Sequence, residues 1–258
     1  MDMTEVMHHI RLQRGNVGRY VLLPGDPGRC RKIAEYLDKA ELVAENREYT
    51  TYSGFLLDEK VSVTSTGIGG PSAAIAVEEL AQIGADTFIR VGTSGGFQDY
   101  AQVGDLAIVL GAVREEGTTQ LYVPLAFPAV ADIDVTMALR GAATNLGVRH
   151  HVGVCRSTDA FYGSLSPESM PVGYELKNRL DAWYAAGVLC SEMEAATVLT
   201  VSRIRRRRAG CVVLINSNRR LPPLDPEELA SRRDLDPLIR TAVDALKILI
   251  EQDREGLS

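Results

Sequence analysis

The chain has 258 residues, 45% of them hydrophobic, and a formal net charge of −6. This length and composition fit one domain with a substantial core, which we expect to cover residues 1–258. The acidic balance argues against a general nucleic-acid binder, which usually carries a basic face. The four cysteines are widely spaced and no apolar run is long enough to span a membrane. We therefore expect a cytoplasmic protein with reduced thiols and no disulfide or metal framework.

Short apolar runs rich in β-branched residues alternate with segments of helical spacing along the chain. We expect strands at residues 20–23, 61–65, 86–91, 105–110, 152–157, 188–190 and 211–215, and extended chain at 41–55. We expect helices at residues 29–42, 72–83 (capped by Ser72), 132–146, 175–186, 195–203 and 235–252. Residues 158–174 are predicted to be irregular, and residues 221–234, with three prolines, to be mobile, with a solvated helix start at Asp225, Glu227 and Glu228. This order predicts an α/β fold, with a mixed, mostly parallel central sheet flanked by helices in a single domain.

The stretch from residue 86 to residue 97 combines an apolar strand with a polar end. Arg90 interrupts the strand, and the sequence Gly-Thr-Ser-Gly-Gly follows it directly at residues 92–96. Small residues at a strand end can bring backbone N–H groups close to an anion, and an arginine adds a fixed fork of donors. This pattern predicts an anion site at the carboxyl edge of the sheet. The alternative is a plain strand–loop junction with a salt-bridged arginine.

Three other strand ends also carry polar clusters, and ligands of α/β sheets bind outside the carboxyl ends of strands. The four clusters are Gly25/Asp26/Arg29, Arg90/Thr93/Ser94/Gly95, Glu192/Met193/Glu194 and Asn216/Ser217/Asn218. Their convergence would form a pocket with a cationic end suited to phosphate and an acidic end suited to sugar hydroxyls. Phe161 and Tyr162 offer a flat surface for a base ring. Phosphate, pentose and base together describe a nucleoside cleaved by phosphate.

Several motifs in this order resemble those of the nucleoside phosphorylases of the hexameric type, and the uridine phosphorylase branch is the most similar. The matching segments are residues 24–27 (Pro-Gly-Asp-Pro), 47–50 (Arg-Glu-Tyr-Thr), 65–72 (Ser-Thr-Gly-Ile-Gly-Gly-Pro-Ser), 90–95 (Arg-Val-Gly-Thr-Ser-Gly), 127–132 (Phe-Pro-Ala-Val-Ala-Asp) and 192–194 (Glu-Met-Glu). The resemblance covers roughly residues 8–220 and is more specific than a lone glycine motif. It implies reversible phosphorolysis of a nucleoside, with phosphate as co-substrate and no cofactor.

The resemblance also implies roles for individual residues. Arg90 and Glu194 would be catalytic, and the phosphate site would comprise Gly25, Arg29, Arg90, Thr93 and, from a neighbouring subunit, Arg47. Ribose would be bound by Thr93, Met193, Glu194 and the neighbour's His9, and the base by Ser94, Gly95 and Phe161. In some members a monovalent cation such as K⁺ lies between subunits, at positions that match Glu48, Ile68 and Ser72. Sites shared in this way imply a homo-oligomer, which we expect to be a hexamer built of three dimers.

The loop after Phe161 departs from the uridine phosphorylase pattern. Ser164 and Ser169 stand where a glutamine and an arginine that recognise uracil are expected. Purine-cleaving relatives place an acid near the position of Asn216, and an amide cannot protonate a leaving base. The residues that would recognise either kind of base are therefore absent from their expected positions. From the overall resemblance to the uridine phosphorylase branch, we expect uridine or a related pyrimidine nucleoside as substrate. The alternatives are a purine nucleoside phosphorylase, a nucleosidase of the same fold, and a catalytically silent nucleoside-binding protein. The sequence does not distinguish ribose from deoxyribose.

Overall fold

The structure is a computed structural model that describes residues 5–256. Its strands are β1 (Tyr20–Pro24), β2 (Asp38–Asn46), β3 (Tyr49–Leu56), β4 (Glu59–Thr64), β5 (Thr87–Gly96), β6 (Leu106–Glu115), β7 (Ala129–Val130), β8 (His150–Thr158), β9 (Cys190–Glu192) and β10 (Arg208–Asn218). Its α-helices are α1 (Pro27–Ala34), α2 (Gly70–Gln82), α3 (Ile133–Asn145), α4 (Phe161–Leu165), α5 (Gly173–Ala185), α6 (Ala195–Ile204), α7 (Pro226–Arg232) and α8 (Asp236–Glu255). Two short 3₁₀ turns lie at Thr119–Leu121 and Pro167–Ser169.

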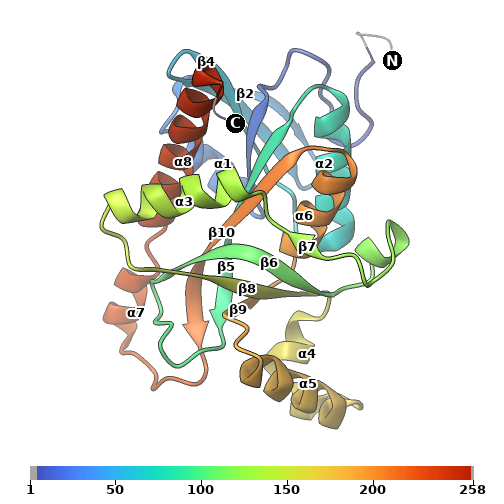
Figure 1. Ribbon diagram of the computed structural model, residues 1–258, viewed down its shortest axis with the longest axis vertical. Helices are drawn as coiled ribbons and strands as arrows, with labels where there is room; N and C mark the ends of the chain where they lie inside the picture. The colour runs from blue at the N-terminus through green and yellow to red at the C-terminus, as the bar shows by residue number, and fades with distance from the viewer. Residues whose placement is uncertain (1–4, 257–258) are drawn as a thin grey trace.

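All the strands belong to one mixed sheet, in the order β10-β6-β8-β9-β5-β1-β4-β3-β2, with β7 beside β6. β5 is the hub, because it pairs in parallel with β1 and β10 and antiparallel with β9. The additional β10–β5 pairing closes β5, β10, β6, β8 and β9 into a ring. The carboxyl end of β5 therefore lies where strands from both halves of the chain meet (Figure 1).

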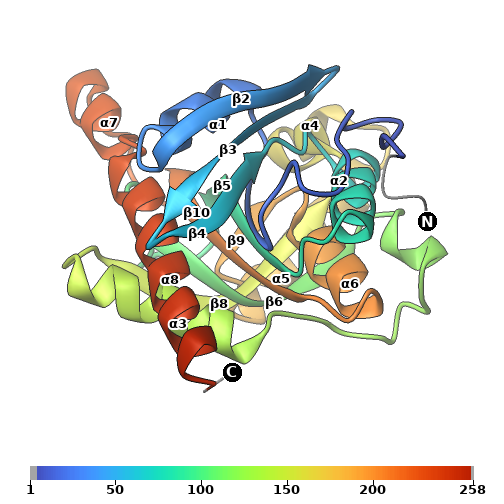
Figure 2. The ribbon, with the colours of Figure 1, turned by 90° about the horizontal axis from the view of Figure 1, so that it is seen from above.

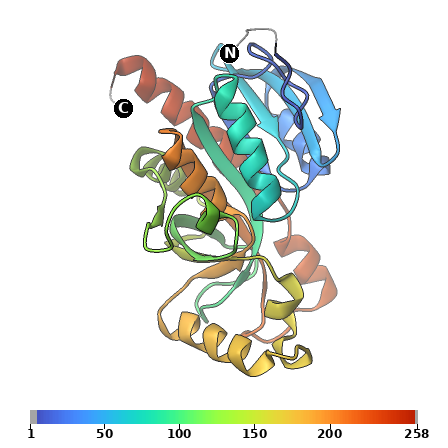
Figure 3. The ribbon, with the colours of Figure 1, turned by 90° about the vertical axis from the view of Figure 1, so that its right-hand side faces the viewer.

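Two apolar cores cover the two faces of this sheet. One core packs residues of α2 and α6 against one face, and the other packs residues of α1, α3 and α8 against the opposite face. Figure 2 shows the two groups of helices on either side of the sheet. α4 and α5 lie beyond the end of the sheet, away from both cores (Figure 3). No helix within residues 5–256 is long and apolar enough to cross a membrane.

The predicted fold class, a single α/β domain with a mixed central sheet flanked by helices, is confirmed. The expected domain limits, residues 1 and 258, lie outside the described residues. Three local predictions were wrong. The first helix ends at Ala34 because β2 begins at Asp38; α2 is capped at Gly69 and not at Ser72; and residues 158–174, predicted to be irregular, contain α4 and a 3₁₀ turn. The helix start expected at Asp225 is confirmed, because α7 begins directly after it.

Candidate active site

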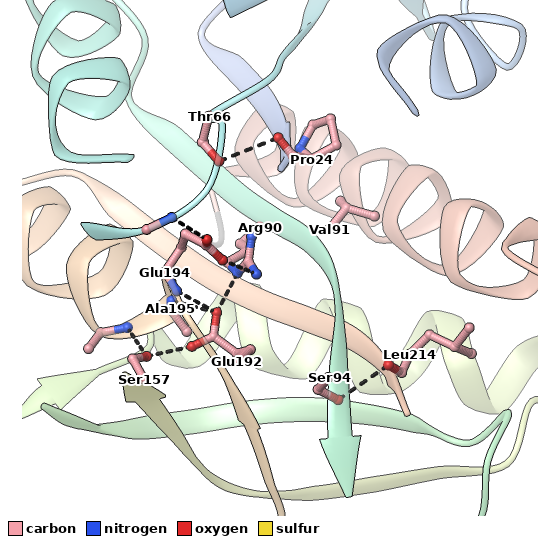
Figure 4. A network of polar contacts seen from close by, with 12 residues as sticks. Pro24, Thr66, Arg90, Val91, Ser94, Ser157, Glu192, Glu194, Ala195 and Leu214 are labelled. Atoms are coloured by element: carbon pink, nitrogen blue, oxygen red, sulfur yellow. Dashed lines mark hydrogen bonds and ion pairs between the residues drawn. The ribbon is translucent and has the colours of Figure 1, made fainter. Parts of the chain in front are cut away.

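Arg90 and two glutamates form a buried charged cluster at the centre of the site (Figure 4). The Arg90 Nε donates to Glu192 Oε2 at 2.7 Å, and its Nη2 lies 2.5 Å from Glu194 Oε2. Burial opposes the charge on Arg90, but the two carboxylates outweigh it and raise the pKa of the guanidinium. Arg90 is thus salt-bridged, as the alternative interpretation expected, yet only two of its three nitrogens are engaged by these carboxylates.

Glu192 is fully occupied in holding the cluster together. Its Oε2 also accepts the backbone N–H groups of Glu194 and Ala195, both at 2.8 Å, and its Oε1 accepts the Ser157 hydroxyl at 2.5 Å. These bonds tie β8, β9 and the start of α6 to Arg90, as Figure 4 shows. Glu192 is therefore a structural acceptor at a helix start, which fits the preference for acids there.

Glu194 keeps part of its acceptor capacity. Its Oε1 accepts the backbone N–H of Gly69 at 2.5 Å, and its Oε2 faces Arg90. Burial raises the pKa of Glu194, although the charge of Arg90 lowers it again in part. A carboxylate has about four lone-pair sites, so two remain for ligand hydroxyls.

Three buried guanidinium donors lack a partner among the described residues, and two of them, Arg90 Nη1 and Arg29 Nε, belong to the predicted phosphate site. Arg29 lies on α1, and its Nη1 donates to the Val91 carbonyl at 3.0 Å. Burial lowers the pKa of Arg29, and repulsion from Arg90 lowers it further. A Cβ at Gly25 would lie 4.0 Å from Arg90 Nη1, so the absence of a side chain at Gly25 leaves space beside this donor. Unpaired buried donors and a mutually repelling cation pair are the features that an anion would relieve.

Gly92 makes room for the guanidinium of Arg90. A Cβ on residue 92 would lie 2.8 Å from Arg90 Nη2 and 3.0 Å from Cζ, closer than side-chain atoms tolerate. Gly92, two residues after Arg90 in β5, therefore leaves the space that the guanidinium occupies on this face of the strand.

The remaining strand-end residues divide between the two faces of β5. Thr93 and Gly95 are its half-exposed residues, whereas Ser94 is buried and donates its hydroxyl to the Leu214 carbonyl at 3.2 Å. Of residues 93–95, only Thr93 and Gly95 thus present half-exposed side-chain positions, on the face of β5 opposite to Arg90. Met193 is half-buried between the two glutamates, and the Phe161 ring at the start of α4 is exposed, edge-on to Tyr162.

His9 and Arg47 lie together but make no hydrogen bond or ion pair with Arg90 or Glu194 in the described chain. His9 Nδ1 lies 2.6 Å from Glu79 Oε1, and both oxygens of Glu79 also accept the His9 backbone N–H. Because a carboxylate only accepts, Nδ1 carries the proton, and in the neutral ring Nε2 is left as a free acceptor. Asn46 donates to the His9 carbonyl at 2.6 Å, which fixes this segment beside the β2–β3 turn that carries the exposed Arg47.

Of the three residues expected at a cation site, Glu48 and Ser72 are in contact, and Ile68 is exposed. The Ser72 hydroxyl donates to Glu48 Oε1 at 2.9 Å and also contacts the Thr66 carbonyl. The backbone N–H of Glu48 lowers the pKa of its carboxyl, and Ser72 lowers it further, so Glu48 is charged. The Ile68 side chain is 79% exposed beside them. These hard oxygen atoms suit a hard cation.

The sequence interpretation missed Arg156, a second buried arginine near the site. It lies on β8 and pairs with Glu115 on β6, while its Nη1 donates to the Ser164 hydroxyl at 2.8 Å and to the Ser191 hydroxyl at 3.3 Å. A cation in an otherwise apolar strand was the only local signal. Asn216, in contrast, lies at a bulge of β10, and its carbonyl accepts from Arg233.

Comparison with known proteins decides the family. The model of the phosphorylase superfamily matches residues 19–251. The chain belongs to the phosphorylase superfamily. Within it, the chain is 48% identical to a uridine phosphorylase of Treponema pallidum over 97% of this chain and 96% of that protein. It is 47% identical to a uridine phosphorylase of Thermococcus kodakarensis over 97% of this chain and 89% of that protein.

A relative with another named substrate is also similar. A guanosine phosphorylase of Halorubrum lacusprofundi is 41% identical over 81% of this chain and 83% of that protein. The resemblance to nucleoside phosphorylases inferred from the motifs is therefore confirmed. Sequence identity alone does not distinguish uridine from guanosine as the substrate, because relatives of both kinds are similar. The residues of the site have to distinguish them.

Proposed function

We propose that the protein is a pentosyltransferase that cleaves uridine, or a closely related nucleoside, with phosphate to give free base and ribose 1-phosphate. The observation that carries the proposal is the pair of unpartnered buried donors, Arg29 Nε and Arg90 Nη1, beside the acidic acceptor Glu194. An anion fits the two donors, and the hydroxyl groups of a sugar fit the acceptor. The uridine phosphorylase relatives support uridine as the substrate.

Arg29 and Arg90 would bind the phosphate, with Gly25 and Thr93 at its sides. A phosphate oxygen then attacks the anomeric carbon, and the bond between that carbon and the base nitrogen breaks. The electron pair leaves with the base. Holding the two reactants in line can remove on the order of 7–11 kcal/mol of the barrier. The engaged nitrogens of Arg90 fix its orientation, so its remaining donor is preorganised for the anion.

Glu194 would accept hydrogen bonds from the ribose hydroxyls, with Met193 against the sugar. In the transition state the sugar gains positive charge, and the nearby carboxylate stabilises it. Phe161 and Gly95 would border the base. Because the Ser94 hydroxyl is already bonded to Leu214, Ser94 would contribute only through its backbone.

His9 and Arg47 would complete the site of a neighbouring subunit. Arg47 is exposed at a hairpin turn of the edge strand β2, and His9 presents Nε2 from the adjoining segment. An exposed cation and a free acceptor fixed on one patch fit a phosphate and a sugar hydroxyl across an interface.

A hexamer of three dimers needs a second contact surface besides this edge. An apolar set on β6, β7, α3 and β8 supplies one, because Leu110, Val130, Ile133, Met137, Val152 and Val154 are all exposed. Val130 and Val154 both lie opposite Gly111, so the set is continuous across three strands.

The oxygen atoms of Glu48 and Ser72 would hold K⁺ at the dimer contact, next to Arg47, and the Ile68 position would close the site. The cation would balance the Glu48 charge and stabilise the turn that carries Arg47. A cytoplasmic location stays our prediction, which the four free, buried cysteines support.

Guanosine is the second candidate substrate, because the guanosine phosphorylase relative is similar over most of the chain. The decisive experiment measures base release from uridine, deoxyuridine, cytidine, guanosine and adenosine, each with and without phosphate. Phosphate-dependent release of uracil, and its loss in Arg29→Met, supports the proposal. Release without phosphate would instead identify a nucleosidase, and binding without release would identify a silent binding protein.

A further inference from the structure

Arg156 on β8 is a buried arginine that contacts α4, the helix that begins with Phe161. Arg156 has a side chain that is only 4% exposed, and its Nε pairs with the carboxylate of Glu115. Its Nη2 donates to the Thr158 hydroxyl at 3.2 Å, and its Nη1 donates to the hydroxyls of Ser164 and Ser191. A buried guanidinium whose outer donors all end on hydroxyl groups is unusual for a purely structural ion pair.

The position of Arg156 in the sheet connects it to the half-exposed side of β5, which carries Thr93 and Gly95. Arg156 lies opposite Ser191 in the β8–β9 pairing, and Ser191 lies opposite Gly95 in the β9–β5 pairing. Directly opposed residues point to the same face of a sheet. The row Arg156–Ser191–Gly95 therefore shares a face with Thr93, two residues before Gly95, and Ser191 is half-exposed on it.

The hydrogen bonds determine where the Ser191 proton points. A hydroxyl has one donor and two acceptor sites. Because Ser191 Oγ accepts from Arg156, its own O–H is directed elsewhere, and within residues 5–256 no acceptor for it is found. Bonding to a cation also strengthens the hydroxyl as a donor. Ser164 bonds to the same guanidinium, which holds α4, the helix that begins with Phe161, in place.

We propose that Arg156 is a positioning residue that turns the Ser191 hydroxyl into a polarised donor for a ring carbonyl of the base. This inference rests on the proposed function. The leaving base carries a developing negative charge, which is shared with its oxo groups, so the donor binds the transition state more strongly than the bound nucleoside. A donor directed at the 4-oxo group of uracil or the 6-oxo group of guanine donates a hydrogen bond to it, and disfavours the amino group that cytosine or adenine carries at the corresponding position.

The test compares Arg156→Met and Ser191→Ala with the unchanged protein on uridine, 5-fluorouridine and cytidine. Fluorine makes the base a better leaving group, so its departure depends less on the donor. We expect kcat for uridine to fall about ten- to a hundredfold in Arg156→Met. The ratio of kcat for 5-fluorouridine to kcat for uridine should rise at least about threefold in both variants. The KM for phosphate should stay within about twofold, since Arg29 and Arg90 are untouched.

Arg179→Met is the matched control. Arg179 also approaches Glu115, at 3.6 Å, but its side chain is 56% exposed and it contacts neither serine. This variant should behave like the unchanged protein. Arg156→Lys, which keeps a charge and a donor, should recover part of the uridine rate.

The outcomes separate the inference from the proposed function. If the unchanged protein cleaves no nucleoside with phosphate, the proposed function fails. If it is active but neither Arg156→Met nor Ser191→Ala changes the 5-fluorouridine ratio or the discrimination against cytidine, the role of Arg156 is overturned. Ser191→Ala keeps the Arg156–Glu115 pair intact, so the test stands even if Arg156→Met does not fold.

Discussion

Replacing Gly92 with alanine tests the geometry of the anion site without removing any charge. The added Cβ would lie 2.8 Å from Arg90 Nη2 and 3.1 Å from Val213 Cγ1. Carbon and nitrogen atoms in contact prefer about 3.5 Å, so the guanidinium has to move by about 0.7 Å. Such a shift breaks the close approach of Nη2 to Glu194 and carries Nη1 away from the phosphate position. A misplacement of about 1 Å can cost about a hundredfold in rate.

We therefore expect Gly92→Ala to raise the KM for phosphate and lower kcat/KM about ten- to a hundredfold, with a loss of about 1–3 kcal/mol in the free energy of unfolding. Uracil release at varied phosphate concentration gives the kinetic constants, and urea unfolding gives the stability. Gly153→Ala is the control, because its Cβ would meet Leu189 at an ordinary 3.4 Å. A folded Gly92→Ala protein with an unchanged phosphate KM would refute the placement of the phosphate at Arg90.

Three further predictions concern the sugar side and the shared site. Burial raises the pKa of Glu194, so this carboxylate is protonated at a higher pH than an ordinary glutamate. The ribose then loses an acceptor as the pH falls, and the ratio of the rate of the unchanged protein to that of Glu194→Gln should decrease toward acid pH. A ratio that stays constant across pH would contradict this. Glu79→Gln should loosen His9 and raise the nucleoside KM about tenfold, whereas Glu78→Gln, next to it on α2 but paired with Arg205, should not. Refolded mixtures of Arg47→Ala and Arg90→Ala should recover about a quarter of the normal activity, because half of the dimers are mixed and each has one intact site; no recovery would exclude a site shared through Arg47.

The core of the site could be predicted because its signals are local. A cation inside an apolar strand, followed by small residues, identified Arg90 and the strand end. The Glu-Met-Glu segment identified Glu194, and the structure brings these two side chains within 2.5 Å. The alternation of strands and helices was enough for the fold class, since each element carries its own periodicity.

The errors and omissions depend on contacts that are distant in sequence or on caps that were misread. α2 begins after Gly69, whose left-handed φ of 93° and bond to Glu194 set the helix start, so Ser72 is left to bond Glu48. The start of α7, in contrast, was predicted, because Asp225 precedes a proline and two glutamates; the structure confirms that Asp225 accepts from the backbone of Glu227 and Glu228. For Arg156, the cation in an apolar strand was not followed by the small residues that marked Arg90, and its partners are distant, since Glu115 lies 41 residues away and Ser191 lies 35.

The most direct test identifies the product that carries the ribose. We would incubate the protein with uridine and phosphate and follow the phosphorus NMR spectrum together with uracil release. If Arg29 and Arg90 present phosphate as the nucleophile, ribose 1-phosphate appears in equal amounts with uracil, and omitting phosphate stops both. Free ribose formed at the same rate without phosphate would contradict the proposed reaction.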